Sequence, residues 1–251
     1  MLSVLITAGF DIATRNHAQA ILSGDFSEET EGLVSALLGF QISSREIIKS
    51  GGGQAASTMR LRDALYDKGW QKHEFVVQTI VDGEEREATS HEVDHVRRCS
   101  GGTLALEIEW NNKDPFFDRD LENFQRLHAQ GAISVGVLVT RGAALQAELT
   151  KIVASTIRKE GILDASELKE WGVKDRTERQ MHLLSSLLKK QVPFADAFAQ
   201  SFVADKFGAA TTHWEKLEDR IRRGVGNPCP LLLIGLPLSA VSDYSAAKEE
   251  L

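Results

Sequence analysis

The alternation of hydrophobic and polar positions along the chain predicts a mixture of helices and strands. Apolar residues recur at helical spacing in some segments and follow strand-like patterns in others. Helices are expected at 28–38, 57–68, 116–129, 143–159, 178–190 and 194–206. Strands are expected at 74–81, 91–97, 103–110, 133–140 and 230–235.

The middle of the chain gives the clearest pattern. Residues 103–110 alternate as in a half-buried strand, which places Glu107 and Glu109 on one face. Asp114 as N-cap, followed by proline at the first helical position, predicts the start of a helix. Residues 133–139 are a continuous apolar run, typical of a buried parallel strand. Strand, helix and strand form a crossover unit, so we expect an α/β fold with a central mixed β-sheet flanked by helices.

The composition is that of an ordinary globular protein, with 42% hydrophobic and 26% charged residues among 251. Two cysteines, Cys99 and Cys229, make no disulfide framework, and we expect reduced thiols in a cytoplasmic protein. No apolar run approaches the roughly 20 residues of a membrane span. The N-terminus lacks the basic flank of a secretory signal, so we expect no membrane association.

Charge is distributed unevenly along a chain whose net charge is -7. Residues 107–122 contain six acids and two bases, whereas residues 151–190 contain nine bases and six acids. An acidic centre followed by a more basic half suits a metal site beside an anionic ligand.

Three acids are expected to converge if the strands around residue 100 form a hairpin. A turn centred on the Ser-Gly pair at 100–101 makes the numbers of facing residues sum to 201. Asp94 then lies opposite Glu107, and Glu92 lies opposite Glu109. A solvated strand face with alternating acids is the simpler alternative. A convergent cluster, however, is unfavourable without a cation, and carboxylate oxygens favour Mg²⁺, Mn²⁺ or Ca²⁺. Such an ion is what phosphodiester hydrolysis requires.

The same residues resemble a known nuclease family. Asp94, thirteen residues and then Glu107-Ile108-Glu109 resemble the PD-(D/E)XK motif. The surrounding sequence, at 91–94, 106–121 and 133–140, is similar to that of type II restriction endonucleases of the BglII and BstYI kind, with BamHI as a more distant relative. Stretches at 210–217 and 229–235 are similar as well, so the likeness covers about residues 60–236.

The resemblance implies Mg²⁺-dependent hydrolysis of double-stranded DNA at a short palindrome by a homodimer. Its relatives share a GATC centre and leave four-base 5′ overhangs with 5′-phosphate ends, and a cognate DNA methyltransferase would be a functional partner. It also implies one restriction-endonuclease-like domain, residues 1–251, with an N-terminal helical part at 1–56 and a catalytic core at 57–236.

By the same resemblance, Asp94, Glu107 and the backbone carbonyl of Ile108 hold the metal, and Glu109 positions or deprotonates the attacking water. The sequence departs from the wider superfamily in having valine before Asp94 and Glu109 in place of the motif lysine. The BamHI type carries glutamate at this position and the BglII type glutamine, so the change fits these relatives better than the wider superfamily. An upstream polar residue completes such sites, and both Glu74 and Gln78 are candidates.

Seven residues near the expected site carry groups suited to base edges or phosphate. They are Asn111, Asn112, Lys113, Arg141, Thr211, Thr212 and His213. A basic helix ending in Arg220, Arg222 and Arg223 follows them. The glycines at 51–53 suggest either a linker or a loop that becomes ordered on DNA.

Two other functions are compatible with parts of the sequence. His91-Glu92-Val93-Asp94-His95 matches the H-E-x-x-H signature of zinc proteases, which requires a helix carrying both histidines on one face. The polar residues at 83–87 and the charge of Asp94 count against a buried helix there. A DNA-binding protein with an inactive nuclease centre is the other alternative.

Overall fold

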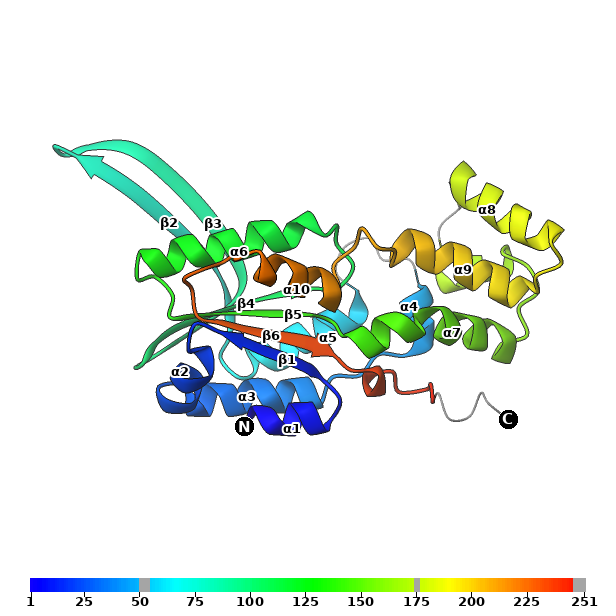
Figure 1. Ribbon diagram of the computed structural model, residues 1–251, viewed down its shortest axis with the longest axis horizontal. Coiled ribbons are helices and arrows are strands. Elements are labelled where there is room, and N and C mark those ends of the chain that lie inside the picture. The colour runs from blue at the N-terminus through cyan, green and yellow to red at the C-terminus, as the bar shows by residue number, and fades with distance from the viewer. Residues whose placement is uncertain (50–54, 174–176, 246–251) are drawn as a thin grey trace.

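A six-stranded mixed sheet runs through the centre of the molecule, in the order β1-β6-β5-β4-β3-β2 (Figure 1). The structure is a computed structural model that describes residues 1–49, 55–173 and 177–245, so the predicted loop at 51–53 lies outside the described residues. The strands are β1 Asp11–Arg15, β2 Gln71–Val81, β3 Glu84–Cys99, β4 Gly102–Glu109, β5 Val135–Arg141 and β6 Leu231–Leu236.

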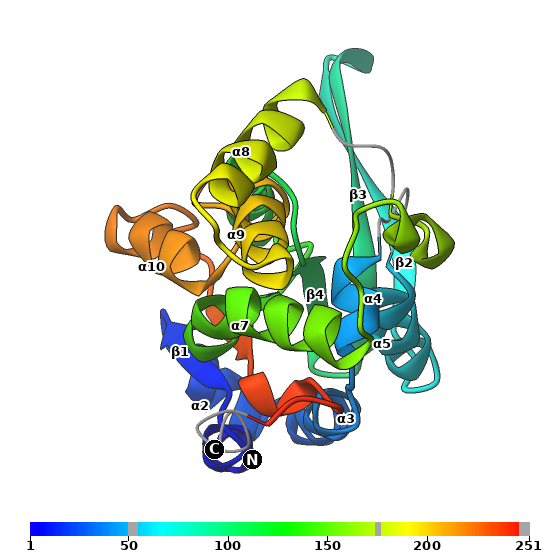
Figure 2. The ribbon, with the colours of Figure 1, turned by 90° about the vertical axis from the view of Figure 1, so that its right-hand side faces the viewer.

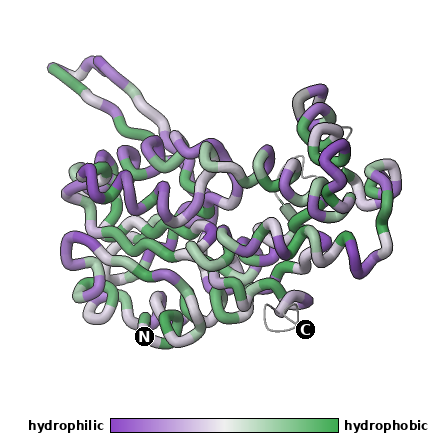
Figure 3. Tube along the Cα trace, turned by 45° about the vertical axis from the view of Figure 1, so that its right-hand side comes forward, coloured by the Kyte–Doolittle hydropathy of each residue, from purple (hydrophilic) through white to green (hydrophobic). Residues whose placement is uncertain are grey.

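Strands β4, β5 and β6 are parallel to one another, whereas β1, β2 and β3 pair antiparallel with their neighbours. Every residue of β5 and β6 is buried, in keeping with sequences that are apolar except for Thr140 and Arg141 at the end of β5. Figure 3 shows these central strands as mostly hydrophobic, with alternating hydropathy along the outer helices. The α/β fold with a central mixed sheet is therefore confirmed.

Helices cover both faces of the sheet. Helices α6 (Pro115–Ala129) and α10 (Trp214–Arg222) pack on one face through aromatic and aliphatic residues such as Phe117, Phe124 and Trp214. The helices of the other face are α1 Leu2–Thr7, α2 Ala18–Gly24, α3 Ser27–Leu38, α4 Ser44–Ile48, α5 Ala56–Tyr66, α7 Ala143–Lys159 and α9 Phe194–Lys206. Helix α8 (Glu178–Lys189) packs on α9. Two short 3-10 helices, η1 (Glu167–Trp171) and η2 (Leu238–Ala240), also occur in the chain.

A long two-stranded hairpin projects from the sheet. Strand β3 pairs with β4 only from His95 onward, so its first part pairs with β2 alone. The turn is Asp82-Gly83, with both residues at positive φ (55° and 82°), as a two-residue hairpin turn requires. Figures 1 and 2 show this hairpin rising on the same side of the molecule as α8.

The predicted register of the β3–β4 hairpin is confirmed where the ladder exists. All five pairs, from Cys99 opposite Gly102 to His95 opposite Leu106, have numbers that sum to 201. The pairing of Glu92 with Glu109 was wrong, because β3 has left β4 by that point. Glu92 instead lies opposite Glu74 on β2 and forms an ion pair with Lys72 at 2.6 Å.

Six predicted helices and five predicted strands have observed counterparts, most within a few residues of the expected ends; β3 begins seven residues earlier than expected. The N-terminal segment, expected to be helical, also contributes strand β1, which pairs with β6 and closes the sheet edge. In the parts of the chain that the structure covers, no helix is long and apolar enough to cross a membrane.

Candidate active site

Two glutamates at the carboxyl end of β4 form the centre of the candidate site. Glu107 and Glu109 face α6, and their residues are only 8% and 3% exposed. The alternation of β4 places them there, because Ile108 between them packs against the core of the opposite face. The predicted common face of Glu107 and Glu109 is therefore observed.

Asp94 reaches this centre from β3. Its backbone N–H donates to Oε1 of Glu107 over 3.4 Å. The pairing of β2 with β3 is irregular between Gln71 and His73, opposite Asp94 and its neighbours. Asp94 is half-buried, and together with Ile108 it lines a cavity of about 470 Å³.

A fourth carboxylate, which the sequence prediction missed, belongs to the same cluster. Asp120 of α6 is 2% exposed, and its charge acts on both Glu107 and Glu109. Arg119 reaches Asp120 at 2.7 Å and Glu109 at 3.6 Å. The signal was present in the sequence, because Asp120 lies on the apolar face of its helix, three residues after Phe117.

Burial and mutual repulsion make these carboxylates weak acids. Burial, and then the charges of Asp120 and Asp94, raise the pKa of Glu107 well above its ordinary value. Burial, and then the charge of Asp120, raise the pKa of Glu109 to about 8. The pKa of Asp120 is raised as well, chiefly by burial. A cation among these groups would favour their charged forms.

The donor atoms at this edge suit a hard divalent cation. Oδ2 of Asp120 is buried without a hydrogen-bond partner. Among the described residues, no three His, Cys, Asp or Glu side chains form a ready-made metal cluster. Mg²⁺ is commonly held by only one or two carboxylates and keeps several waters. Asp94, Glu107 and the carbonyl of Ile108 fit an ion of that class.

Two of the predicted DNA-contact segments lie side by side. Lys113 and Thr211 form an isolated antiparallel bridge, and the N–H of Thr212 donates to the carbonyl of Asn112 at 2.8 Å. Nδ2 of Asn112 donates to Oε2 of Glu109 at 2.7 Å, which connects this loop pair directly to the carboxylates. Asn111 is half-buried and lines the cavity.

Three of the predicted DNA contacts are buried in the structure. Arg141 is 0% exposed, and its guanidinium donates to Gln146, to the carbonyl of Trp110 and to Thr211. Thr212 and His213 are 0% and 6% exposed. Arg141 therefore fastens β5 to the neighbouring loops and does not present its charge to a ligand.

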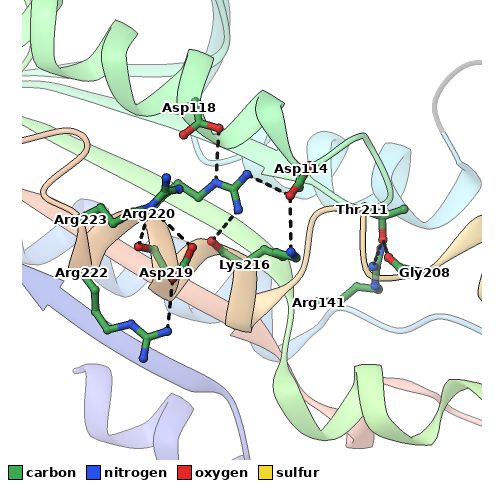
Figure 4. Close-up of polar contacts among 10 residues, drawn as sticks. All are labelled: Asp114, Asp118, Arg141, Gly208, Thr211, Lys216, Asp219, Arg220, Arg222 and Arg223. Carbon is green, nitrogen blue, oxygen red and sulfur yellow. Dashed lines mark hydrogen bonds and ion pairs between the residues drawn. The ribbon is translucent and has the colours of Figure 1, made fainter.

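The arginines of helix α10 also form ion pairs with aspartates of the same chain. Arg220 is buried and forms ion pairs with Asp114 at 3.0 Å and Asp118 at 3.3 Å (Figure 4). Asp114 occupies the N-cap position of α6, as predicted, but its side chain makes no cap hydrogen bond and pairs with Arg220 instead. Arg222 and Arg223 both lie within 3.7 Å of Asp219.

The two candidates for the upstream polar residue both lie on β2. Gln78 is in the projecting hairpin and donates to Glu85 at 2.8 Å. Its position is about 20 Å along the strand from the point opposite Asp94, at roughly 3.3 Å per residue. Glu74 lies opposite Glu92, only two residues from Asp94, and is the nearer of the two.

The zinc-protease hypothesis is wrong. It requires a helix, and residues 91–95 lie within strand β3. His95 is buried, and burial lowers its pKa to about 4, while its Nδ1 contacts the carbonyl of Leu106 at 3.3 Å. In a strand, His91 and His95 are about 13 Å apart, at roughly 3.3 Å per residue, so they cannot bind one zinc ion together.

Comparison with known proteins gives one match that covers most of the chain. The family model described as "Restriction endonuclease BglII/BglIII" matches residues 10–236. The match includes the candidate site, the adjoining loops around Lys113 and Thr211, and strand β1. No curated protein matches the chain.

Proposed function

Because the chain belongs to the BglII/BglIII restriction endonuclease family, we propose that it cuts double-stranded DNA at a short palindromic site with Mg²⁺. Membership makes it a site-specific deoxyribonuclease, a hydrolase. The observation that carries the proposal is the cluster of Asp94, Glu107 and Glu109 at the end of β4, joined by Asn112 to the adjacent loop pair.

Asp94, Glu107 and the carbonyl of Ile108 would hold the metal. When bound, Mg²⁺ supplies polarisation of the phosphoryl oxygen and a lowered pKa for a coordinated water. Glu109 would accept the proton from the attacking water. Burial raises the pKa of Glu109 to about 8 in the metal-free protein, and a bound Mg²⁺ would lower it again, which favours the ionised carboxylate that a base requires. Asn112 and Arg119 hold the Glu109 carboxylate in place from two sides.

The DNA contacts that remain from the sequence prediction are Asn111, Asn112, Lys113 and Thr211. Asn112 and Lys113 are exposed, whereas Asn111 and Thr211 are half-buried. Asparagine amides can read adenine edges, and lysine can bind guanine or phosphate. Glu74 is the better candidate for the upstream residue, because it lies closer to Asp94 than Gln78 does.

The biological unit would be a homodimer, because two identical subunits can read a palindrome through one set of contacts. The proposed products have 5′-phosphate ends, and the proposed site has a GATC centre. A cognate DNA methyltransferase would protect the host genome and need not touch this protein.

The metal requirement gives a direct test. Purified protein is incubated with a defined phage DNA in Mg²⁺, in Mn²⁺ and in excess EDTA. Cutting should occur with either ion and stop in EDTA. Undiminished cutting in EDTA contradicts the metal assignment, and binding without any cutting supports an inactive nuclease centre instead.

A further inference from the structure

The cavity of about 470 Å³ beside Asp94 carries more cationic side chains than the catalytic proposal uses. Lys49, Arg62 and Lys206 line it, and they come from three separate parts of the chain. Its acids are Glu46 and Asp94. Glu46 already accepts hydrogen bonds from Arg60 at 2.6 and 2.9 Å, so its charge is balanced.

Lys206, at the end of α9, is a half-buried cation of this cavity. Its Nζ donates to the carbonyls of Ile47 and Lys49, at 3.3 and 2.7 Å, and lies over the rings of Phe202 and Phe207, at 5.3 and 5.4 Å. Within the described part of the chain, no carboxylate forms an ion pair with it. An ammonium has three donors, so these two carbonyls leave one available.

Burial lowers the pKa of Lys206 to about 8, because desolvation disfavours the charged ammonium. An anion in the cavity would offset that effect. Arg62 lies on another wall of the same cavity, where it also contacts Asp63 at 2.8 Å. Ile108 and Asp94 lie on the wall that the cavity shares with the candidate active site.

We propose that this cavity binds a backbone phosphate of the DNA, with Lys206 and Arg62 as its ligands, and so positions the strand beside Asp94. The inference depends on the proposed function, because it takes DNA as the substrate. Lys206 is a positioning residue in this account. It touches a phosphate next to the reacting one and fixes the register of the strand without reading its sequence.

The test measures binding without cleavage. A mixed-sequence 30-base-pair duplex is titrated in EDTA between 50 and 200 mM salt, and the slope of log affinity against log salt is compared among variants. Each phosphate contact contributes about 0.9 to this slope. Lys206→Gln should reduce its magnitude by about 0.9, Lys206→Arg should retain most of it, and Lys68→Gln, at an exposed lysine outside the cavity, should match the wild type.

A folded Lys206→Gln protein with the wild-type slope overturns the inference, because a lysine that only caps α4 would not change salt dependence. If that variant fails to fold, Arg62→Gln decides the question by the same measurement, with loss of slope supporting the inference and an unchanged slope overturning it. Wild-type protein that binds duplex but never cuts it contradicts the proposed function and leaves the phosphate site standing. Wild-type protein that binds no duplex overturns both.

Discussion

Glu107 and Glu109 have similar burial but different proposed tasks. Glu107→Gln removes a metal ligand, and so does Asp94→Asn. Each should slow cutting by about 10³-fold or more, since the metal provides several kcal/mol of transition-state stabilisation. Folding should survive, because the substitution at Glu107 removes a buried charge.

Glu109→Lys restores the commoner superfamily residue and should still be inactive. Near-normal turnover of Glu109→Lys would show that Glu109 does not activate the water.

The raised pKa of Glu109 also predicts how stability depends on pH in the metal-free protein. Its pKa rises from an ordinary 4.5 to about 8 on folding, so the folded state holds the proton more tightly than the unfolded chain. Protonated Glu109 therefore contributes to the free energy of unfolding. This contribution is complete below about pH 4.5 and is lost as the pH rises through 8. In EDTA, the Tm of the wild type should fall relative to that of Glu109→Gln between pH 5 and 8.5. Parallel curves of Tm against pH for the two proteins would contradict the raised pKa of Glu109.

At the scale of elements, Arg220 joins helix α10 to the first turns of helix α6. Its side chain is 8% exposed, and removing it would leave Asp114 and Asp118 without their main partner. Arg220→Met should lower the free energy of unfolding by about 2 kcal/mol, somewhat less than for a fully buried pair. Arg222→Met is the matched control, because Arg222 is 70% exposed, and it should cost at most about 0.5 kcal/mol. Equal urea midpoints for the two variants would contradict this role.

Local pattern was sufficient to predict β4, α6 and β5, because each combines a clear period with recognisable end signals. The register of the β3–β4 hairpin followed from its short turn, and it brought Asp94 to Glu107. The Asp82-Gly83 turn was an available signal for the projecting hairpin that the prediction did not use. The place where β3 leaves β4 has no such signal, since it depends on tertiary packing, and the pairing predicted for Glu92 failed there.

Burial of charged residues was the least predictable part of the site. Arg141 and Arg220 have partners that lie far away in the sequence, and Asp120 acts on Glu107 and Glu109 of another element. A basic residue near a DNA-binding loop looks the same in sequence whether it faces a phosphate or a buried carbonyl. Only Asp120 could have been recognised, by its position on an apolar helix face.

At the scale of the whole molecule, the proposal requires two copies of the chain on one site. Each protomer contributes one carboxylate cluster, so cutting both strands of a palindrome needs a two-fold dimer. Sedimentation at working concentration, with and without a short cognate duplex, should show a dimer at least in the presence of the duplex. A protein that remains monomeric on that duplex and nicks one strand would contradict this arrangement.

Sequencing the ends of digested DNA tests the central claim most directly. Wild type and Glu107→Gln are incubated in parallel with a phage DNA of known sequence in Mg²⁺, and every end produced is mapped. The account predicts discrete fragments whose ends share one short palindrome with 5′-phosphates, and no fragments from Glu107→Gln. Ends scattered without a common sequence, or equal cutting by the variant, would contradict a site-specific nuclease centred on these carboxylates.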